Sequence, residues 1–323
     1  MPENQFEEAP HRSGFVSILG RPNAGKSTLL NAIAGEKLAI VSDKPQTTRV
    51  AVQAVVTRPD AQIVFIDTPG IQHSPSLLNR RLMDSVHASL EERDVLLFLA
   101  DCKRPVGEED ARAIQLLARA GAPSILVLNK TDRLDDKGLL LPKIEEYRAI
   151  HEFADYVPIS ALTGEGVPHL LDVVTAKLPE GPAYFPEDYL TDQPERFLAA
   201  ELIREKVLHN TRQEVPHSTA VIVEAWEEKP NLIRIAATIL LERPGQKAIV
   251  VGTKGVVLKK IGTLARQEME ARFGRKVFLE LFVKVKPGWR DDPRLLGSID
   301  WRSNSVKKPG TEGPIELQSE AES

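Results

Sequence analysis

The sequence predicts two α/β units in one chain. The first is a mostly parallel sheet with helices on both faces, and the second is a smaller α+β unit. Short apolar runs, each ending in a polar turn, recur through the first half, as in buried parallel strands. A Pro-rich stretch near Leu178–Pro194 precedes a different order of elements, and 323 residues is a typical length for two domains.

The first unit opens with a phosphate-binding loop. Gly20 to Ser27 read G-R-P-N-A-G-K-S and match G-x-x-x-x-G-K-S, the pattern of P-loop NTPases. A predicted strand at Phe15–Leu19 leads in, and a predicted helix at 27–34 follows, so backbone N–H groups would point at phosphates. Lys26 would neutralise the β/γ-phosphates, and Ser27 would ligate Mg²⁺. The residues expected to bind phosphate are Asn23, Ala24, Gly25, Lys26, Ser27 and Thr28.

A second motif follows the apolar run Ile63–Ile66, at Asp67-Thr68-Pro69-Gly70. A carboxylate at the end of a buried strand can hold a Mg²⁺-bound water. The Gly70 N–H can then contact a γ-phosphate. D-T-P-G alone is an ordinary turn, but after a phosphate-binding loop it predicts a γ-phosphate sensor.

The segment 44–49 between these motifs, K-P-Q-T-T-R, has no helical or strand pattern. A mobile loop with a threonine can close over Mg²⁺ when a γ-phosphate is present. We expect Thr48 to be the ligand, with Thr47 as its neighbour. A plain loop is the alternative interpretation.

Two further motifs predict guanine recognition. Asn129-Lys130-Thr131-Asp132 follows the predicted strand 124–128 and matches N-K-x-D. The Asp132 carboxylate can accept from guanine N1–H and the exocyclic amine, which adenine cannot match. The predicted strand-end loop after Val157 can offer a backbone N–H to guanine O6. Its residues are Ser160, Ala161 and Leu162. Together the motifs predict a GTP site and disfavour an ATP-dependent kinase or helicase.

The sequence predicts slow intrinsic hydrolysis. Many GTPases position the attacking water with a glutamine just after D-x-x-G. That position holds Ile71, and Gln72 comes one residue late. The Asn23 amide oxygen is a candidate ligand for a monovalent cation such as K⁺, which would act where an arginine finger acts elsewhere. The expected catalytic set is Lys26, Thr48, Asn23 and Gly70.

Composition excludes several classes of protein. No run of about eighteen apolar residues exists, so no membrane-spanning helix is expected. The N-terminus is acidic and has no apolar signal core, so we expect a cytoplasmic protein. Cys102 is the one cysteine and is interpreted as an inert, buried or half-buried thiol.

Charge is distributed unevenly between the two units. The whole chain carries a net charge of −4, which by itself argues against a nucleic-acid partner. Residues 193–290 contain 18 Lys and Arg against 11 Asp and Glu, a net of +7, so the remainder carries −11. This asymmetry predicts an anionic partner for the second unit.

The second unit has a different order of predicted elements from the first. We expect Asp192 and Glu195 to form a capping pair at the start of a helix over 196–209. Strands over 219–226 and 233–241, joined by a loop at 227–231, would follow. The order is completed by a helix over 246–251, a G-x-x-G loop at Gly252–Gly255, a helix over 256–273 and a strand over 277–285. This α-β-β-α-α-β order, with G-x-x-G between the two middle helices, is that of a type II K-homology domain.

A G-x-x-G loop suits single-stranded RNA, because it lets the sugar-phosphate backbone approach while a neighbouring groove holds the bases. The expected RNA-binding residues are Gly252, Thr253, Lys254, Gly255, Lys259, Lys260 and Arg266. Ile249, Val250 and Ile261 would either line the groove or pack the core. Trp289 would either stack on a base or pack at the domain edge.

The motifs G-R-P-N-A-G-K-S, K-P-Q-T-T-R, D-T-P-G, N-K-T-D and S-A-L-T-G-E-G-V resemble those of the Era GTPase family. The resemblance continues through 201–206 and 252–262 to Arg290 and covers roughly 14–290. It implies a GTPase domain joined to a type II K-homology domain that binds the 3′ end of small-subunit (16S) ribosomal RNA. The loop here is G-T-K-G where the family commonly has G-K-G-G, which leaves individual nucleotide contacts open.

The expected domains are a disordered N-terminus at 1–12, a GTPase domain at 13–180, a linker at 181–192, an RNA-binding domain at 193–290 and a mostly disordered extension at 291–323. The leading interpretation is a monomeric GTP/GDP switch that acts on ribosomal RNA in 30S subunit assembly, with Mg²⁺ held by Ser27, Thr48 and Asp67. A peripheral contact with the inner face of the membrane is a further candidate partner. The alternative is a membrane-associated signalling GTPase whose basic second domain binds lipid or protein.

Overall fold

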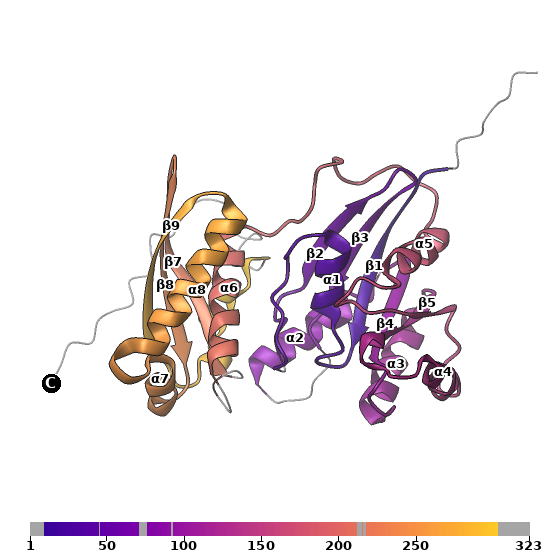
Figure 1. The fold of residues 1–323 in the computed structure, drawn as a ribbon, viewed down its shortest axis with the longest axis horizontal. Coiled ribbons are helices and arrows are strands. Elements are labelled where there is room, and N and C mark those ends of the chain that lie inside the picture. The colour runs from indigo at the N-terminus through magenta and orange to yellow at the C-terminus, as the bar shows by residue number, and fades with distance from the viewer. Residues whose placement is uncertain are drawn as a thin grey trace, which may run out of the picture.

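The computed structural model describes residues 10–44, 46–70, 76–91, 93–211, 215 and 218–302. Figure 1 shows two units side by side, with the N-terminal unit in indigo to magenta and the C-terminal unit in orange. A linker passes from one to the other. The predicted fold class, a parallel-rich α/β unit followed by an α+β unit, is confirmed.

The first unit is built on a six-stranded sheet of order β2-β3-β1-β4-β5-β6. Only β2 runs antiparallel to its neighbour, and the other pairs are parallel. The carboxyl ends of β1, β3, β4 and β5 therefore meet at one edge, where ligands bind in such sheets. The strands are β1 (Arg12–Gly20), β2 (Val52–Thr57), β3 (Ala61–Asp67), β4 (Val95–Asp101), β5 (Ser124–Asn129) and β6 (Asp155–Pro158).

Helices cover both faces of this sheet. α1 (Lys26–Ala34) and α5 (Val167–Lys177) share one apolar cluster with β1, β3 and β5. α2 (Leu77–Ala88), α3 (Glu108–Ala120) and α4 (Leu140–Arg148) pack on the opposite face. Every residue of β4 is buried, as expected for a central parallel strand covered on both sides.

The second unit is a three-stranded sheet of order β7-β8-β9 with helices on one face. β7 and β8 are antiparallel, and β8 and β9 are parallel. The elements are α6 (Glu195–Asn210), β7 (Ala220–Lys229), β8 (Leu232–Leu241), α7 (Pro244–Val251), α8 (Val256–Phe273) and β9 (Lys276–Val285). This is the predicted α-β-β-α-α-β order.

Two local predictions need correction. The expected loop at 227–231 is mostly strand, because β7 and β8 pair as far as Lys229 and Leu232. The expected cap at Asp192 does not form: the residue before α6 is Pro194, with no side-chain cap, and Asp192 instead pairs with Arg302 Nη2 at 2.9 Å. The described start of the extension, 291–302, contains α9 (Pro293–Ile299), whose Leu296 packs into an apolar cluster.

The linker lies along the first unit. The Gln62 side chain accepts from the Tyr184 and Phe185 N–H groups and donates to the Phe185 carbonyl. The Val55 N–H donates to the Leu190 carbonyl at 2.8 Å. The chain therefore enters α6 from a fixed position on the first sheet. No helix in the described part of the chain is long and apolar enough to cross a membrane.

Candidate functional site

The phosphate-binding loop leaves β1 at Gly20 and enters α1 at Lys26. Gly25 has a φ of 103°, and a Cβ on it would lie 2.3 Å from Asn129 Nδ2. Only glycine fits this conformation and this approach. No side chain caps α1. Its first N–H groups are therefore donors for a ligand at the loop, and the helix dipole favours an anion there.

Lys26 brings a buried positive charge to the loop. It is 6% exposed, and its Nζ donates to the carbonyls of Gly20 and Arg21 at 3.1 Å each. Burial lowers the pKa of Lys26, and the nearby Asp67 carboxylate partly opposes this. A desolvated ammonium gains stability from an anion, so the position favours phosphate binding.

The three expected Mg²⁺ ligands come together. Ser27 Oγ lies 2.8 Å from both Thr48 Oγ1 and Asp67 Oδ2, and Thr48 Oγ1 lies 3.1 Å from Asp67 Oδ2. Neighbouring ligands of an octahedral Mg²⁺ lie about 3 Å apart. Asp67 is fully buried, and its Oδ1 has no hydrogen-bond partner. Burial raises the pKa of Asp67 while Lys26 lowers it. This oxygen set fits a small divalent cation.

A cavity of about 50 Å³ lies over these residues. The phosphate-binding loop lines one side and the 41–48 loop the other, with Gly70 at the end. Thr47 and Thr48 both line it. The segment 44–49 forms no helix or strand in its described part, as predicted.

The N-K-x-D motif joins two loops. Asn129 is 1% exposed, and its Nδ2 donates to the Ala24 carbonyl at 2.8 Å while its Oδ1 accepts from Ala161 N–H at 2.9 Å. It therefore ties the phosphate-binding loop to the loop after β6. Asp132 Oδ1 accepts from Ser160 Oγ at 2.6 Å, which orients the carboxylate expected to read guanine. Leu162 is 75% exposed beside them.

Asp101, at the end of β4, is a site residue that the sequence reasoning missed. Its carboxylate accepts from Lys130 Nζ at 2.8 Å, and the same ammonium donates to the Asn23 carbonyl at 2.6 Å. Lys130 itself has a φ of 70°. The position of Asp101 at the same sheet edge as Asn129 was the available signal. Neighbouring Cys102 is buried, and burial raises the pKa of its thiol, which fits an inert residue.

Asn23 and Gly70 also lie at this site. Asn23 Nδ2 donates to the Asp43 carbonyl at 2.7 Å, so its amide is oriented by the loop that carries Thr48. A Cβ on Gly70 would lie 3.0 Å from Pro22, which places the end of D-T-P-G against the phosphate-binding loop. Ile71 and Gln72, on which the expectation of slow hydrolysis depends, lie outside the described residues.

The G-x-x-G loop of the second unit joins α7 to α8. Gly252, Lys254 and Gly255 all have positive φ, at 69°, 52° and 77°. A Cβ on Gly252 would lie 2.5 Å from Val257 Cγ2. Lys254, Lys259 and Lys260 are exposed around the loop, and Thr253 is exposed within it. Arg266 forms an ion pair with Glu270 at 3.0 Å, one turn along α8.

Burial distinguishes between the two interpretations, RNA contact or core packing, for the apolar residues of the second unit. Val250 and Ile261 are fully buried and belong to the core. Ile249 is 46% exposed and faces solvent beside the G-x-x-G loop. Trp289 is fully buried, and its Nε1 donates to the Ser218 carbonyl at 3.0 Å. The packing interpretation of Trp289 is therefore correct and the base-stacking one is wrong.

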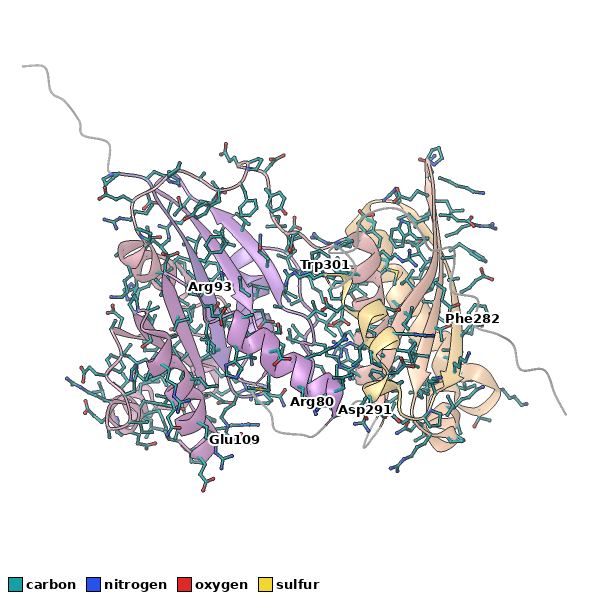
Figure 2. The ribbon with its side chains drawn as sticks, turned by 180° about the vertical axis from the view of Figure 1, so that it is seen from behind. Arg80, Arg93, Glu109, Phe282, Asp291 and Trp301 are labelled. Carbon is teal, nitrogen blue, oxygen red and sulfur yellow. The ribbon has the colours of Figure 1, made fainter. Side chains whose placement is uncertain are left out.

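The second unit contacts the first at the loop that carries Thr48 and at helix α2. Leu78 and Leu82 of α2 pack with Trp289 and Leu296. Figure 2 shows the end of α2 beside Asp291, whose Oδ1 accepts from the Leu77 N–H at 2.7 Å. The nucleotide site and the second unit thus share one boundary.

Arg49 lies at the centre of this boundary. Its Nη1 donates to the Thr219 carbonyl at 2.7 Å, and its guanidinium carbon lies 5.5 Å from the centre of the Trp289 ring. Its Nε and Nη2 are buried without a hydrogen-bond partner. Burial lowers the pKa of Arg49 to about 9, and the positive charge of Arg204 adds to this.

Helix α6 supplies two buried charges that the sequence analysis did not assign a role. Arg204 donates to carbonyls of Gln46 and Thr47. Glu205 is 1% exposed and accepts from the Val41 N–H at 3.0 Å and from Lys37 Nζ at 2.7 Å. Arg and Glu side chains are mostly exposed in proteins, so no local signal in this helix distinguished these two from solvent-exposed charges.

Two family models match the chain. One, described as a 50S ribosome-binding GTPase, matches residues 15–130, and a KH domain matches residues 214–290. Among curated proteins, the GTPase Era of Geobacter metallireducens is 52% identical over 92% of this chain and all of its own length. The GTPase Era of Syntrophus aciditrophicus is 51% identical over 88% of this chain and 94% of its own.

Two solved Era structures are also similar to this chain. A variant of Aquifex aeolicus Era bound to GDP and aluminium fluoride superimposes with a TM-score of 0.86 and 42% identity, over 89% of this chain and 98% of that one. An Era structure in complex with MgGDPNP and nucleotides 1506–1542 of 16S ribosomal RNA has a TM-score of 0.87, with 42% identity over 90% of this chain and 98% of that one.

Proposed function

The chain belongs to the Era family of GTPases, and from that membership we propose that it is a GTP-controlled switch that binds 16S ribosomal RNA near its 3′ end and acts in assembly of the 30S subunit. One observation supports the RNA partner most strongly. The left-handed Gly252–Gly255 loop lies in a chain whose 42% identical neighbour holds 16S ribosomal RNA nucleotides.

The GTP site would work through residues that the structure already orients. Lys26 and the N–H groups of α1 bind the phosphates, and Asp132, held by Ser160, accepts from guanine. Mg²⁺, held by Ser27, Thr48 and Asp67, supplies positive charge that offsets the charge developing on the phosphates. Replacing the side chain of either Lys26 or Asp132 by alanine should abolish GDP binding in a calorimetric titration.

Hydrolysis is proposed to be slow without a further factor, and K⁺ near Asn23 is proposed to accelerate it. The Asn23 amide is anchored to the Asp43 carbonyl at the edge of the phosphate cavity, where a cation would face the phosphates. GTP hydrolysis should be faster in KCl than in NaCl at equal ionic strength, and Asn23→Ala should remove the difference. Equal rates in both salts would refute the role of K⁺.

We also propose that nucleotide state controls the packing of the two units. The 44–49 loop and α2 contribute directly to their boundary, so a change in either alters that contact. Arg49 is buried at this contact with two nitrogens that have no hydrogen-bond partner, so burying it there carries a desolvation cost. Coupling of this kind is reciprocal, so RNA must favour one nucleotide state as much as that state favours RNA.

Crosslinking in cells followed by sequencing of attached RNA tests the assignment. Reads should concentrate at the 3′ end of the small-subunit ribosomal RNA. A filter-binding comparison of single-stranded RNA with anionic vesicles at moderate salt tests the membrane alternative. Retention of vesicles without retention of RNA would replace the ribosomal proposal by a membrane-associated signalling GTPase.

A further inference from the structure

Helix α6 of the second unit carries Arg204, which contacts the loop that carries Thr48. Arg204 is 1% exposed. Its Nη2 donates to the Thr47 carbonyl, and its Nη1 lies 3.4 Å from the Gln46 carbonyl. Glu201, one turn earlier, accepts from Arg204 Nε at 2.7 Å and from Nη2 at 2.6 Å. This pair fixes the plane of the guanidinium.

The two carbonyls lie directly before Thr48. Gln46 has a φ of 61°, a left-handed conformation that a residue with a side chain adopts only at a cost. Bonds from Arg204 to the carbonyls of Gln46 and Thr47 stabilise this bend. The bend in turn carries the Thr48 hydroxyl to within 2.8 Å of Ser27 Oγ and 3.1 Å of Asp67 Oδ2.

We propose that Arg204 is a positioning residue for the Mg²⁺ site, so that the first helix of the RNA-binding unit takes part in recognising the triphosphate. The inference rests on the proposed GTP switch. Ser27 and Asp67 are placed by the first unit alone. The loop that carries Thr48 is held from both units, because Gln46 Nε2 donates to Asn79 Oδ1 of α2 at 3.1 Å and Arg204 bonds the two carbonyls from the second unit. Because such a threonine ligates Mg²⁺ only when a γ-phosphate is present, loss of Arg204 weakens triphosphate binding and spares diphosphate binding.

A simpler role for Arg204 would be to hold the two units together. Arg272 provides a matched control, because it also joins the units by a charged contact, to Glu36 at the start of the same loop. Glu36 is ten residues before Gln46, and Arg272 makes no hydrogen bond or ion pair to the described residues 46–48. The variant Arg272→Gln therefore loosens the boundary and leaves the bend before Thr48 intact.

The test measures dissociation of fluorescent GMPPNP and fluorescent GDP from the full chain over a range of Mg²⁺ concentrations. Arg204→Lys should release GMPPNP about 10- to 100-fold faster, as expected for loss of charged hydrogen bonds. The Mg²⁺ concentration that half-protects bound GMPPNP should rise by a similar factor. GDP release from Arg204→Lys, and both rates for Arg272→Gln, should stay within about twofold of wild type.

Thr48→Ala separates positioning from structural damage. With the Thr48 hydroxyl gone, adding Arg204→Lys should change GMPPNP release by less than about twofold. A further loss in the double variant, or equal losses for GDP and GMPPNP, would overturn the proposal. If Arg204→Lys does not yield folded protein, Glu201→Gln should give a smaller change in the same direction, and wild-type behaviour of that variant would also overturn it. A wild-type chain that binds no GMPPNP with Mg²⁺ would instead refute the GTP switch itself.

Discussion

Asn129→Ala tests whether the guanine site depends on the tie between two loops. The Asn129 side chain bonds the Ala24 carbonyl at 2.8 Å and the Ala161 N–H at 2.9 Å. Both partners are buried, at 3% and 4% exposure. Leaving a buried backbone group unpaired costs about 1–3 kcal/mol. With partial access of water, the two groups together should cost about 2–4 kcal/mol.

Most of that cost should appear in nucleotide binding. Without a nucleotide, both loops can relax and let water reach the two backbone groups, but binding must restore their positions. At about 1.4 kcal/mol per tenfold change, GDP affinity should fall by about 30- to 700-fold. Isothermal titration calorimetry with GDP and Mg²⁺ measures this directly.

Asn31→Ala is the matched control. Asn31 also ties backbone groups together, bonding the Ala39 carbonyl and the N–H groups of Leu38 and Ala39, but away from the guanine motifs. It should lower the unfolding temperature and keep GDP affinity within about threefold. If Asn129→Ala binds GDP as well as wild type, or if Asn31→Ala weakens GDP equally, the reasoning is wrong.

Three further predictions concern the second unit. In a filter-binding assay, Lys254→Ala should weaken binding of single-stranded RNA and reduce the slope of log affinity against log salt by about 0.7. Lys229 is exposed on the β7–β8 hairpin, and Lys229→Ala should change neither the affinity nor the slope. Trp289→Ala should lower the free energy of unfolding by about 3–5 kcal/mol, measured by denaturant titration, whereas Trp289→Phe should leave RNA affinity unchanged because the ring is fully buried. Burial would raise the pKa of Glu205, but hydrogen bonds from Lys206, Lys37 and the Val41 N–H lower it overall. The ionised Glu205 therefore stabilises the fold above the ordinary glutamate pKa of 4.5, and this contribution is lost as pH falls below that value. In thermal unfolding scans, the difference in stability between wild type and Glu205→Gln should shrink between pH 6 and pH 3.5. A difference that stays constant over this range would contradict the prediction.

The local sequence was sufficient where structure follows from short-range patterns. The strand-loop-helix order around Lys26 was predicted because apolar runs, glycines and the G-K-S end specify it within a few residues. The helix over Val256–Phe273 was predicted to the residue. Gly255 and Gly274 flank this helix, both in the left-handed conformation. Glycines at helix boundaries can be recognised from the sequence, so they predicted where the helix ends.

Predictions failed where a residue's partner is far away in the chain. Asp192 has the pattern of a helix cap, yet it pairs with Arg302, 110 residues later. Trp289 could have stacked on RNA, and its burial depends on Ser218 and on Leu78 of the other unit. The side-chain pattern alone cannot distinguish these partners, because it records what a residue can bond and not what tertiary packing brings to it.

The sequence by itself indicated the nucleotide, because each motif expected to contact phosphate or guanine follows a strand and parallel strands bring those ends to one edge. Tertiary structure alone decided that Thr47, Arg49 and α2 lie against the second unit. That arrangement depends on Arg204 and Glu205 of α6, which are ordinary charged helix residues until the two units pack and bury them. Burial then makes each of their hydrogen bonds costly to lose, which ties the RNA-binding unit to the nucleotide loop.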